Sequence, residues 1–238
     1  MGTGALFTLG EAAEGMMDGM NRTLQHQAQE KNRARISRAS RHLKLSLNAA
    51  IKDDAQELIH VHVRLSIILW MSWLESSVLW LASHPKLAAA ARDSIFVDKR
   101  MSHEKKWRTL LEHLTIGQPV ARANQIKTMI EWVISDVKTY AEVRNKLAHG
   151  QWDTCLTSNN DKRNPEITKR VLELNKGDIL RLKAVAEKLV DLTMLLITGS
   201  ASFDAEFTRS VARVEKARRD YSGDVDWLVA EIRRRRRE

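Results

Sequence analysis

The chain has 238 residues, 43% of them hydrophobic and 29% charged, which is enough apolar sequence for a packed core. Its single cysteine excludes a disulfide framework or a cysteine-rich zinc site within one chain. The net charge of +9 favours polyanionic partners such as nucleic acid. Only three prolines and ten glycines interrupt the chain, and alternating strand patterns are scarce. We therefore expect an all-α protein.

The first predicted element is a helix near the N-terminus. Apolar residues recur at steps of three and four between Leu6 and Leu24, which is the spacing of one face of a helix. A basic stretch follows at residues 31–44. The pattern does not distinguish packing on the rest of the chain from packing on a partner chain.

The most apolar part of the sequence lies in a predicted helix over residues 52–85. Asp53 or Asp54 favours its start, and Pro85 marks its end. In its middle, apolar residues occupy nearly every face of the helix. This apolar segment is about as long as a short membrane span. Glu75 lies near that middle, where a membrane would make a carboxylate costly. We therefore expect a buried core helix and no membrane segment.

Two helices are predicted in the middle of the chain. Ser102 is a typical N-cap for a helix over residues 102–114. The next helix is predicted over residues 121–149, and Gly150 fits its C-terminal cap. Residues 157–165 are polar and predict a loop.

Three further helical stretches are predicted toward the C-terminus. The first covers residues 176–199, with Asp178 as its N-cap. The others cover about 203–219 and 224–237.

This succession predicts three parts: a helical extension at 1–50, a helical bundle at 51–200 and a basic helical extension at 201–238. The last helix ends in consecutive arginines, which form either a solvated terminus or a tail that binds RNA phosphates. These arginines are Arg233, Arg234, Arg235, Arg236 and Arg237.

Arg144 stands where the apolar stripe through Val133, Val137 and Tyr140 predicts an aliphatic side chain. A buried guanidinium without a partner is costly, so an acid should compensate it. Glu75 is the matching exception in the apolar core helix. We therefore expect Arg144 and Glu75 to meet, either as a structural ion pair or as part of a functional site.

Asn145 and His149 are four residues apart and share a face of the same helix, next to that of Arg144. An arginine, an amide and an imidazole are therefore expected to converge near the end of this helix. This spacing alone is not specific, because a histidine near a helix end is often structural or merely exposed.

The segment RNKLAHG resembles the Arg-x4–6-His motif of HEPN domains, and WMSWLESSVLWL resembles the HEPN core helix that carries a glutamate within an apolar run. The order along the chain matches, and the resemblance covers roughly residues 50–200. It implies an all-α bundle that pairs face to face, so that the motifs of two protomers line one cleft. Many HEPN members are metal-independent ribonucleases of toxin, abortive-infection and CRISPR-associated systems.

The resemblance implies roles for individual residues. Arg144 and His149 would be the catalytic pair, Asn145 a polar helper, and Glu75 the residue that orients Arg144. Attack by the ribose 2′-OH would then leave a 2′,3′-cyclic phosphate without a metal. Some HEPN toxins carry a tyrosine two residues after the histidine, where this chain has Gln151, so regulation through that tyrosine is not expected.

Other candidate sites are weaker. Trp152 follows the motif and is a candidate either to stack on an RNA base or to cover the helix end. His60 and His62 would diverge by about 200° on a helix, so we expect no metal site there. No glycine-rich phosphate-binding motif occurs, and no cofactor is expected.

The first hypothesis is therefore a cytoplasmic, homodimeric HEPN endoribonuclease that cleaves RNA in a prokaryotic defence or toxin system, with a possible antitoxin or defence partner. The second is a non-catalytic HEPN-like module that binds RNA, a nucleotide or a partner protein. The third is a basic helical nucleic-acid-binding protein without HEPN relation, which uses its terminal arginines.

Overall fold

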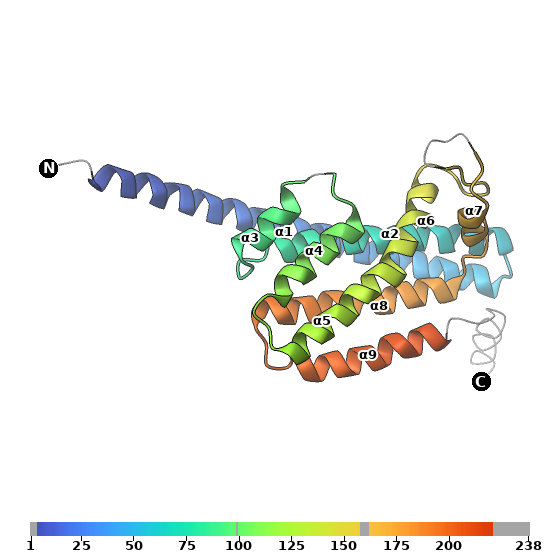
Figure 1. Ribbon diagram of the computed structural model, residues 1–238. Helices are drawn as coiled ribbons and strands as arrows, with labels where there is room; N and C mark the ends of the chain where they lie inside the picture. The colour runs from blue at the N-terminus through green and yellow to red at the C-terminus, as the bar shows by residue number, and fades with distance from the viewer. Residues whose placement is uncertain (1–3, 99, 158–161, 221–238) are drawn as a thin grey trace.

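The computed structural model describes residues 4–98, 100–157 and 162–220, with side chains from residue 23 onward. Helices make up most of this part of the chain, and its only strand-like pairing is an isolated bridge between Leu156 and Arg163. The all-α fold class is therefore confirmed. Figure 1 shows the helices side by side in a bundle, from which one long helix projects.

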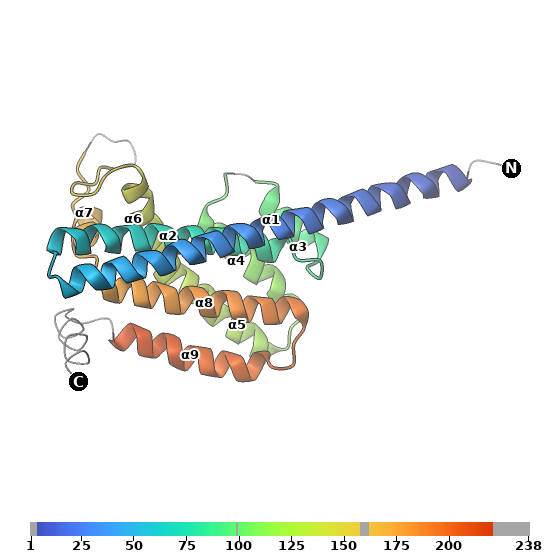
Figure 2. The same cartoon turned by 180° about the vertical axis from the view of Figure 1, so that it is seen from behind.

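The bundle begins with an antiparallel helix pair. The N-terminal part of α1 (Gly4–Lys52) extends beyond the bundle, whereas its second half, from about His26 on, lies along α2 (Gln56–Ala82) (Figures 1 and 2). In the turn between them Asp54 has a φ of 55°, a left-handed conformation that aspartate tolerates better than most residues. The helix predicted over 52–85 therefore begins too early, because Lys52 still belongs to α1.

The central core helix is α2, as its composition predicts. Leu74, Val78 and Leu81 on this helix are fully buried. The helix packs against α1 on one side and against α8 (Lys176–Thr198) on another. Within the described residues, α2 is the one helix long and apolar enough to cross a membrane, and 50% of its most apolar window is buried in the bundle.

Two shorter helices follow α2. The sequence did not predict α3 (Ala89–Phe96), which is only eight residues long. The next helix, α4 (His103–Thr115), forms as predicted, and the Ser102 hydroxyl accepts a hydrogen bond from the Lys105 amide at 3.2 Å. This confirms Ser102 as the N-cap, which satisfies one of the free amides of the first turn.

The helix predicted over 121–149 forms as a continuous rod that contains a π turn. Its parts are α5 (Val120–Trp132), the π-helical segment η1 (Val133–Val137) and α6 (Lys138–Ala148). Gly150 ends the rod with a φ of 73°. Its amide bonds the Leu147 carbonyl, and the Gln151 amide bonds the Lys146 carbonyl at 3.0 Å. These two bonds are those of a Schellman motif, so the predicted glycine cap is confirmed.

The C-terminal part of the bundle contains α7 (Pro165–Leu172), α8 and α9 (Phe203–Asp220), of which α7 was not predicted. The N-cap of α8 is Asn175, whose side chain accepts hydrogen bonds from the Gly177 and Asp178 amides. The Asp178 carboxylate accepts a bond from the Asn175 amide. The prediction of Asp178 as N-cap is therefore wrong, because it is the third helical residue of a capping box.

The last described helix anchors the π turn. The Arg218 guanidinium of α9 forms an ion pair with the Asp136 carboxylate, which also accepts a hydrogen bond from the Ser135 hydroxyl at 2.8 Å. Asp136 is buried, so this pairing compensates a charge that would otherwise be costly. The predicted helix at 224–237 lies outside the described residues.

Because α2 supplies much of the core, we expect Leu74→Ala to lower the free energy of unfolding by about 2–5 kcal/mol, since it leaves a cavity at a fully buried position. Urea unfolding followed by circular dichroism measures the change. Leu58→Ala on the same helix is the matched control, because Leu58 is 52% exposed. Equal losses in the two variants would contradict the central position of α2.

Candidate functional site at the end of α6

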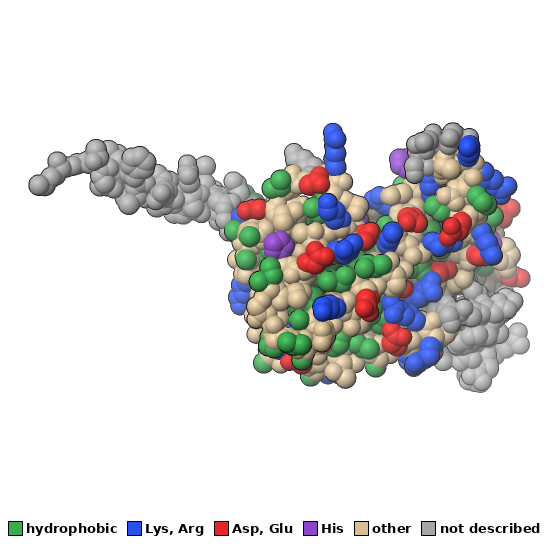
Figure 3. Space-filling model, in the orientation of Figure 1, with side chains coloured by type: hydrophobic (Ala, Val, Ile, Leu, Met, Phe, Trp, Pro, Cys, Tyr) green, Lys and Arg blue, Asp and Glu red, His purple; other side chains and the backbone are tan. Residues whose placement is uncertain are grey.

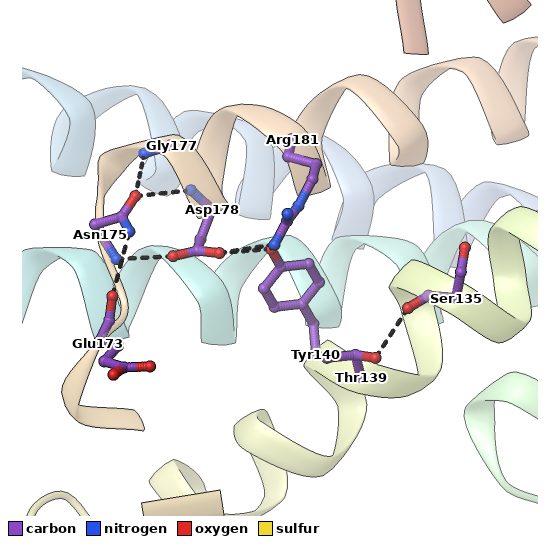
Figure 4. A network of polar contacts seen from close by, with 8 residues as sticks. All are labelled: Ser135, Thr139, Tyr140, Glu173, Asn175, Gly177, Asp178 and Arg181. Atoms are coloured by element: carbon purple, nitrogen blue, oxygen red, sulfur yellow. Dashed lines mark hydrogen bonds and ion pairs between the residues drawn. The ribbon is translucent and has the colours of Figure 1, made fainter. Parts of the chain in front are cut away.

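The position of α6 is set by a polar network around Tyr140 (Figure 4). The Tyr140 hydroxyl donates to the Asp178 carboxylate of α8 at 2.8 Å and accepts hydrogen bonds from the Arg181 guanidinium. Arg181 also pairs with Asp178 at 2.9 Å. Burial raises the pKa of Tyr140 above its ordinary value, so the hydroxyl remains a donor at neutral pH. The network therefore holds α6 against α8 one turn before the predicted motif.

Arg144 and Glu75 meet, as the sequence predicts. The Arg144 Nη2 atom lies 3.3 Å from Glu75 Oε2, and its Nη1 atom donates to Asn145 Oδ1 at 3.1 Å. The expected deep burial is wrong, because the Arg144 and Glu75 side chains are 33% and 43% exposed. Val143 and Leu147 occupy the core-facing positions instead. Arg144 therefore lies at the edge of the buried face, within reach of a ligand in solvent.

His149 is exposed at the C-cap of α6. Its backbone amide bonds the Asn145 carbonyl at 3.2 Å. Within the described part of the chain, its ring makes no hydrogen bond or ion pair, and none joins it to Arg144. The structure thus brings Arg144, Asn145 and Glu75 together and presents His149 separately at the same end of α6.

His103 belongs to the same region, although it was not predicted as a site residue. It is the first residue of α4, and neither of its buried ring nitrogens has a hydrogen-bond partner among the described residues. Burial, together with the nearby positive charges of Arg144 and Lys106, lowers its pKa to about 3. The available sequence signal was its position four residues before Trp107, which places both on one helix face.

Trp152 covers the C-terminal end of α6. Its indole N–H donates to the Leu147 carbonyl at 3.0 Å, and its ring packs partly buried against the core. The Arg64 guanidinium of α2 lies 5.9 Å from the ring centre and pairs with Asp153 at 3.6 Å. Of its two predicted roles, Trp152 therefore fills that of covering the helix end. Stacking on an RNA base stays a prediction.

The surface around the site carries charges of both signs. In Figure 3, Lys and Arg side chains alternate with Asp and Glu side chains over the face that Figure 1 shows. The five arginines from Arg233 to Arg237, predicted to bind RNA, lie outside the described residues. The excess positive charge of the chain is therefore not gathered into one uniform patch on this face.

The remaining histidine pair takes a local role. The His62 ring nitrogen Nδ1 contacts the Leu58 carbonyl at 2.5 Å, one turn earlier on α2, and His60 is exposed. Among the described residues, no group of three or more histidine, cysteine, aspartate or glutamate side chains is arranged to hold a metal ion.

The geometry at the end of α6 suits the recognition of a phosphate. Glu75 and Asn145 restrain the Arg144 guanidinium, which leaves a planar donor group oriented at the surface. His149 presents an exposed imidazole, a group that commonly carries protons in enzyme sites. The two groups together are those needed to bind a phosphodiester and to move a proton at it.

Comparison with known proteins identifies no family for this chain. No protein-family model matches the sequence, and no curated protein and no solved structure matches it.

The lowered pKa of His103 predicts a loss of stability in acid. Its ordinary pKa is 6.5 and its folded pKa about 3, so below pH 6.5 the unfolded chain binds a proton that the folded chain does not. Stability should fall by up to about 1.4 kcal/mol for each pH unit below 6.5. Urea midpoints measured between pH 7 and pH 4.5 should show this slope.

His103→Leu should flatten that slope, because the variant has no proton to bind at this position. His60→Leu, which changes an exposed histidine, is the control and should leave it unchanged. Identical slopes for wild type and His103→Leu would show that His103 is not the acid-sensitive group.

Proposed function

We propose that the protein is a metal-independent endoribonuclease of the HEPN type, in which Arg144 and His149 act on an RNA phosphodiester. The observation that supports this most directly is the position of Arg144, held by Glu75 and Asn145 yet one-third exposed, five residues before an exposed His149. A purely structural ion pair would not require a histidine presented at the end of the same helix.

The proposed reaction is an internal phosphoryl transfer. The ribose 2′-oxygen attacks phosphorus, the bond from phosphorus to the 5′-oxygen breaks, and a 2′,3′-cyclic phosphate remains. One proton leaves the 2′-hydroxyl and one reaches the departing 5′-oxygen, and His149 carries one of these transfers. Arg144 offers two parallel donors to the phosphate oxygens and stabilises the charge that develops on them.

A second copy of the chain completes the proposed site. One chain offers a single exposed imidazole near Arg144, whereas the reaction moves two protons. In a face-to-face dimer, the His149 of the second copy would supply the other transfer. The RNA, the dimer and a cytoplasmic defence or toxin system with an antitoxin or similar partner all belong to this proposal.

A non-catalytic module that binds RNA, a nucleotide or a partner protein is the alternative. It is favoured by the absence of a hydrogen bond between Arg144 and His149 within the described residues. In that case the ion pair between α2 and α6 is structural.

We expect the purified wild-type protein to cleave single-stranded RNA or transfer RNA in the presence of EDTA and to leave cyclic phosphate ends. His149→Ala and Arg144→Ala should each lower the rate by roughly 10²-fold or more, because a proton carrier or a charge-stabilising group is lost. Cleavage gels with end-group analysis measure both effects, and circular dichroism checks folding.

His60→Ala is the matched control, because it removes an exposed histidine elsewhere on the surface. Equal cleavage by all variants would assign the activity to a contaminant. RNA binding without cleavage would support the alternative module.

Glu75→Gln separates a positioning role from a structural one. The substitution keeps the side-chain size but removes the charge that restrains Arg144, so kcat should fall about tenfold with little change in KM. Stability should change by less than about 1 kcal/mol, because exposed ion pairs contribute little. Glu57→Gln, at an exposed position of α2, is the control. A loss of stability without a change in kcat would indicate a structural pair.

A further inference from the structure

A hollow lies between α1, α2 and α8, the three helices that Figure 2 shows side by side. Its volume is about 350 Å³, which is in the range of sites for small molecules. We name it the α1–α2–α8 groove, and the residues that matter for its chemistry are Arg41, Lys44, Trp70, Trp73, Lys183 and Glu187.

The groove is separate from the site at the end of α6. Trp73 precedes Glu75 by two residues on α2, which turns it by about 200° around the helix axis. The groove and the pair of Arg144 with Glu75 therefore use opposite sides of α2. Binding in the groove does not depend on the proposed nuclease site.

The floor of the groove is aromatic. Trp70 and Trp73 are both partly exposed, and their rings meet edge to face with centres 5.4 Å apart. The buried residue Leu47 of α1 and Ile179 of α8 close the floor from the sides. The Lys183 ammonium lies 5.8 Å from the centre of the Trp70 ring, and the Arg33 guanidinium lies 4.9 Å from that of Trp73. A flat, apolar group that stacks on these rings therefore shares them with neighbouring cations.

The walls of the groove are mainly basic. Arg41 and Lys44 of α1 are exposed and form no hydrogen bond or ion pair within the described residues. Lys176 and Lys183 line the opposite wall. Glu187 is the one acidic lining residue, and Lys183 pairs with it at 3.6 Å. The remaining positive charge therefore favours an anion.

We propose that the α1–α2–α8 groove binds a nucleotide, with its base against Trp70 and Trp73 and its phosphate between Arg41 and Lys44. A nucleotide suits both parts of the groove. Its flat base can stack on the aromatic floor, and its phosphate can bind the basic walls. The groove volume suits one such unit rather than a folded partner. The same chemistry occurs in a free nucleotide and in one nucleotide of a single-stranded RNA.

The test is equilibrium dialysis of the full chain with adenosine 5′-monophosphate, adenosine, inorganic phosphate and a five-nucleotide RNA carrying 2′-O-methyl groups. The methyl groups block attack by the 2′-oxygen, so cleavage cannot affect the measurement. We expect the monophosphate to bind more tightly than adenosine or phosphate alone. Equal affinity for the monophosphate and the RNA indicates a free nucleotide, and clearly tighter binding of the RNA indicates a segment of a strand.

Two variants locate the binding site. Arg41→Glu/Lys44→Glu should weaken binding of the monophosphate by about tenfold or more, because it reverses the charges that face the phosphate. Trp70→Leu should weaken it by a similar factor through lost stacking, while binding of inorganic phosphate stays the same. Circular dichroism confirms that each variant is folded.

Arg35→Glu/Arg38→Glu is the matched control, because both residues are exposed on α1 and neither lines the groove. It makes the same charge change and should leave the affinity within about twofold of wild type. Equal weakening by the two charge-reversal variants would overturn the proposal in favour of nonspecific attraction. Unchanged binding of the nucleotide by the groove variants would also overturn the proposal. Displacement of the nucleotide by a glutamate-rich peptide would overturn it as well.

Discussion

The burial of α2 is the constraint on which the rest of the structure depends. Every helix that carries a candidate functional residue packs against it: α6 with Arg144, α4 with His103, and α1 and α8 with the groove. Several of its aliphatic side chains, such as Leu74 and Val78, leave water completely, and this burial provides much of the driving force for assembly.

This constraint explains why two different surfaces share one helix. Glu75 lies on the side of α2 that faces α6, where it restrains Arg144. Trp70 and Trp73 lie on the side that α1 and α8 only partly cover, which leaves the aromatic floor accessible. Because an α-helix separates residues two apart by about 200°, a short segment of α2 serves both surfaces without contact between them.

Polar groups then fix the position of α6 in the bundle. Tyr140 with Asp178 and Arg181 attaches α6 to α8, and Arg218 with Asp136 attaches the preceding π turn to α9. Such networks are costly when incomplete, so they favour one arrangement of the helices over others of similar packing. A fixed α6 matters for the proposed function, because Arg144 and His149 both depend on its position and rotation.

The sequence by itself determined the longer helices of the bundle and one long-range contact. Ser102 and Gly150 mark helix ends through local hydrogen bonds, and the pair of Arg144 with Glu75 was predictable because two opposite charges in apolar helices need each other. The tertiary structure alone decided the partial exposure of that pair, the burial of the His103 ring nitrogens and the groove over Trp70. These properties depend on how helices distant in sequence rotate and cross, which the spacing of residues within one helix does not specify.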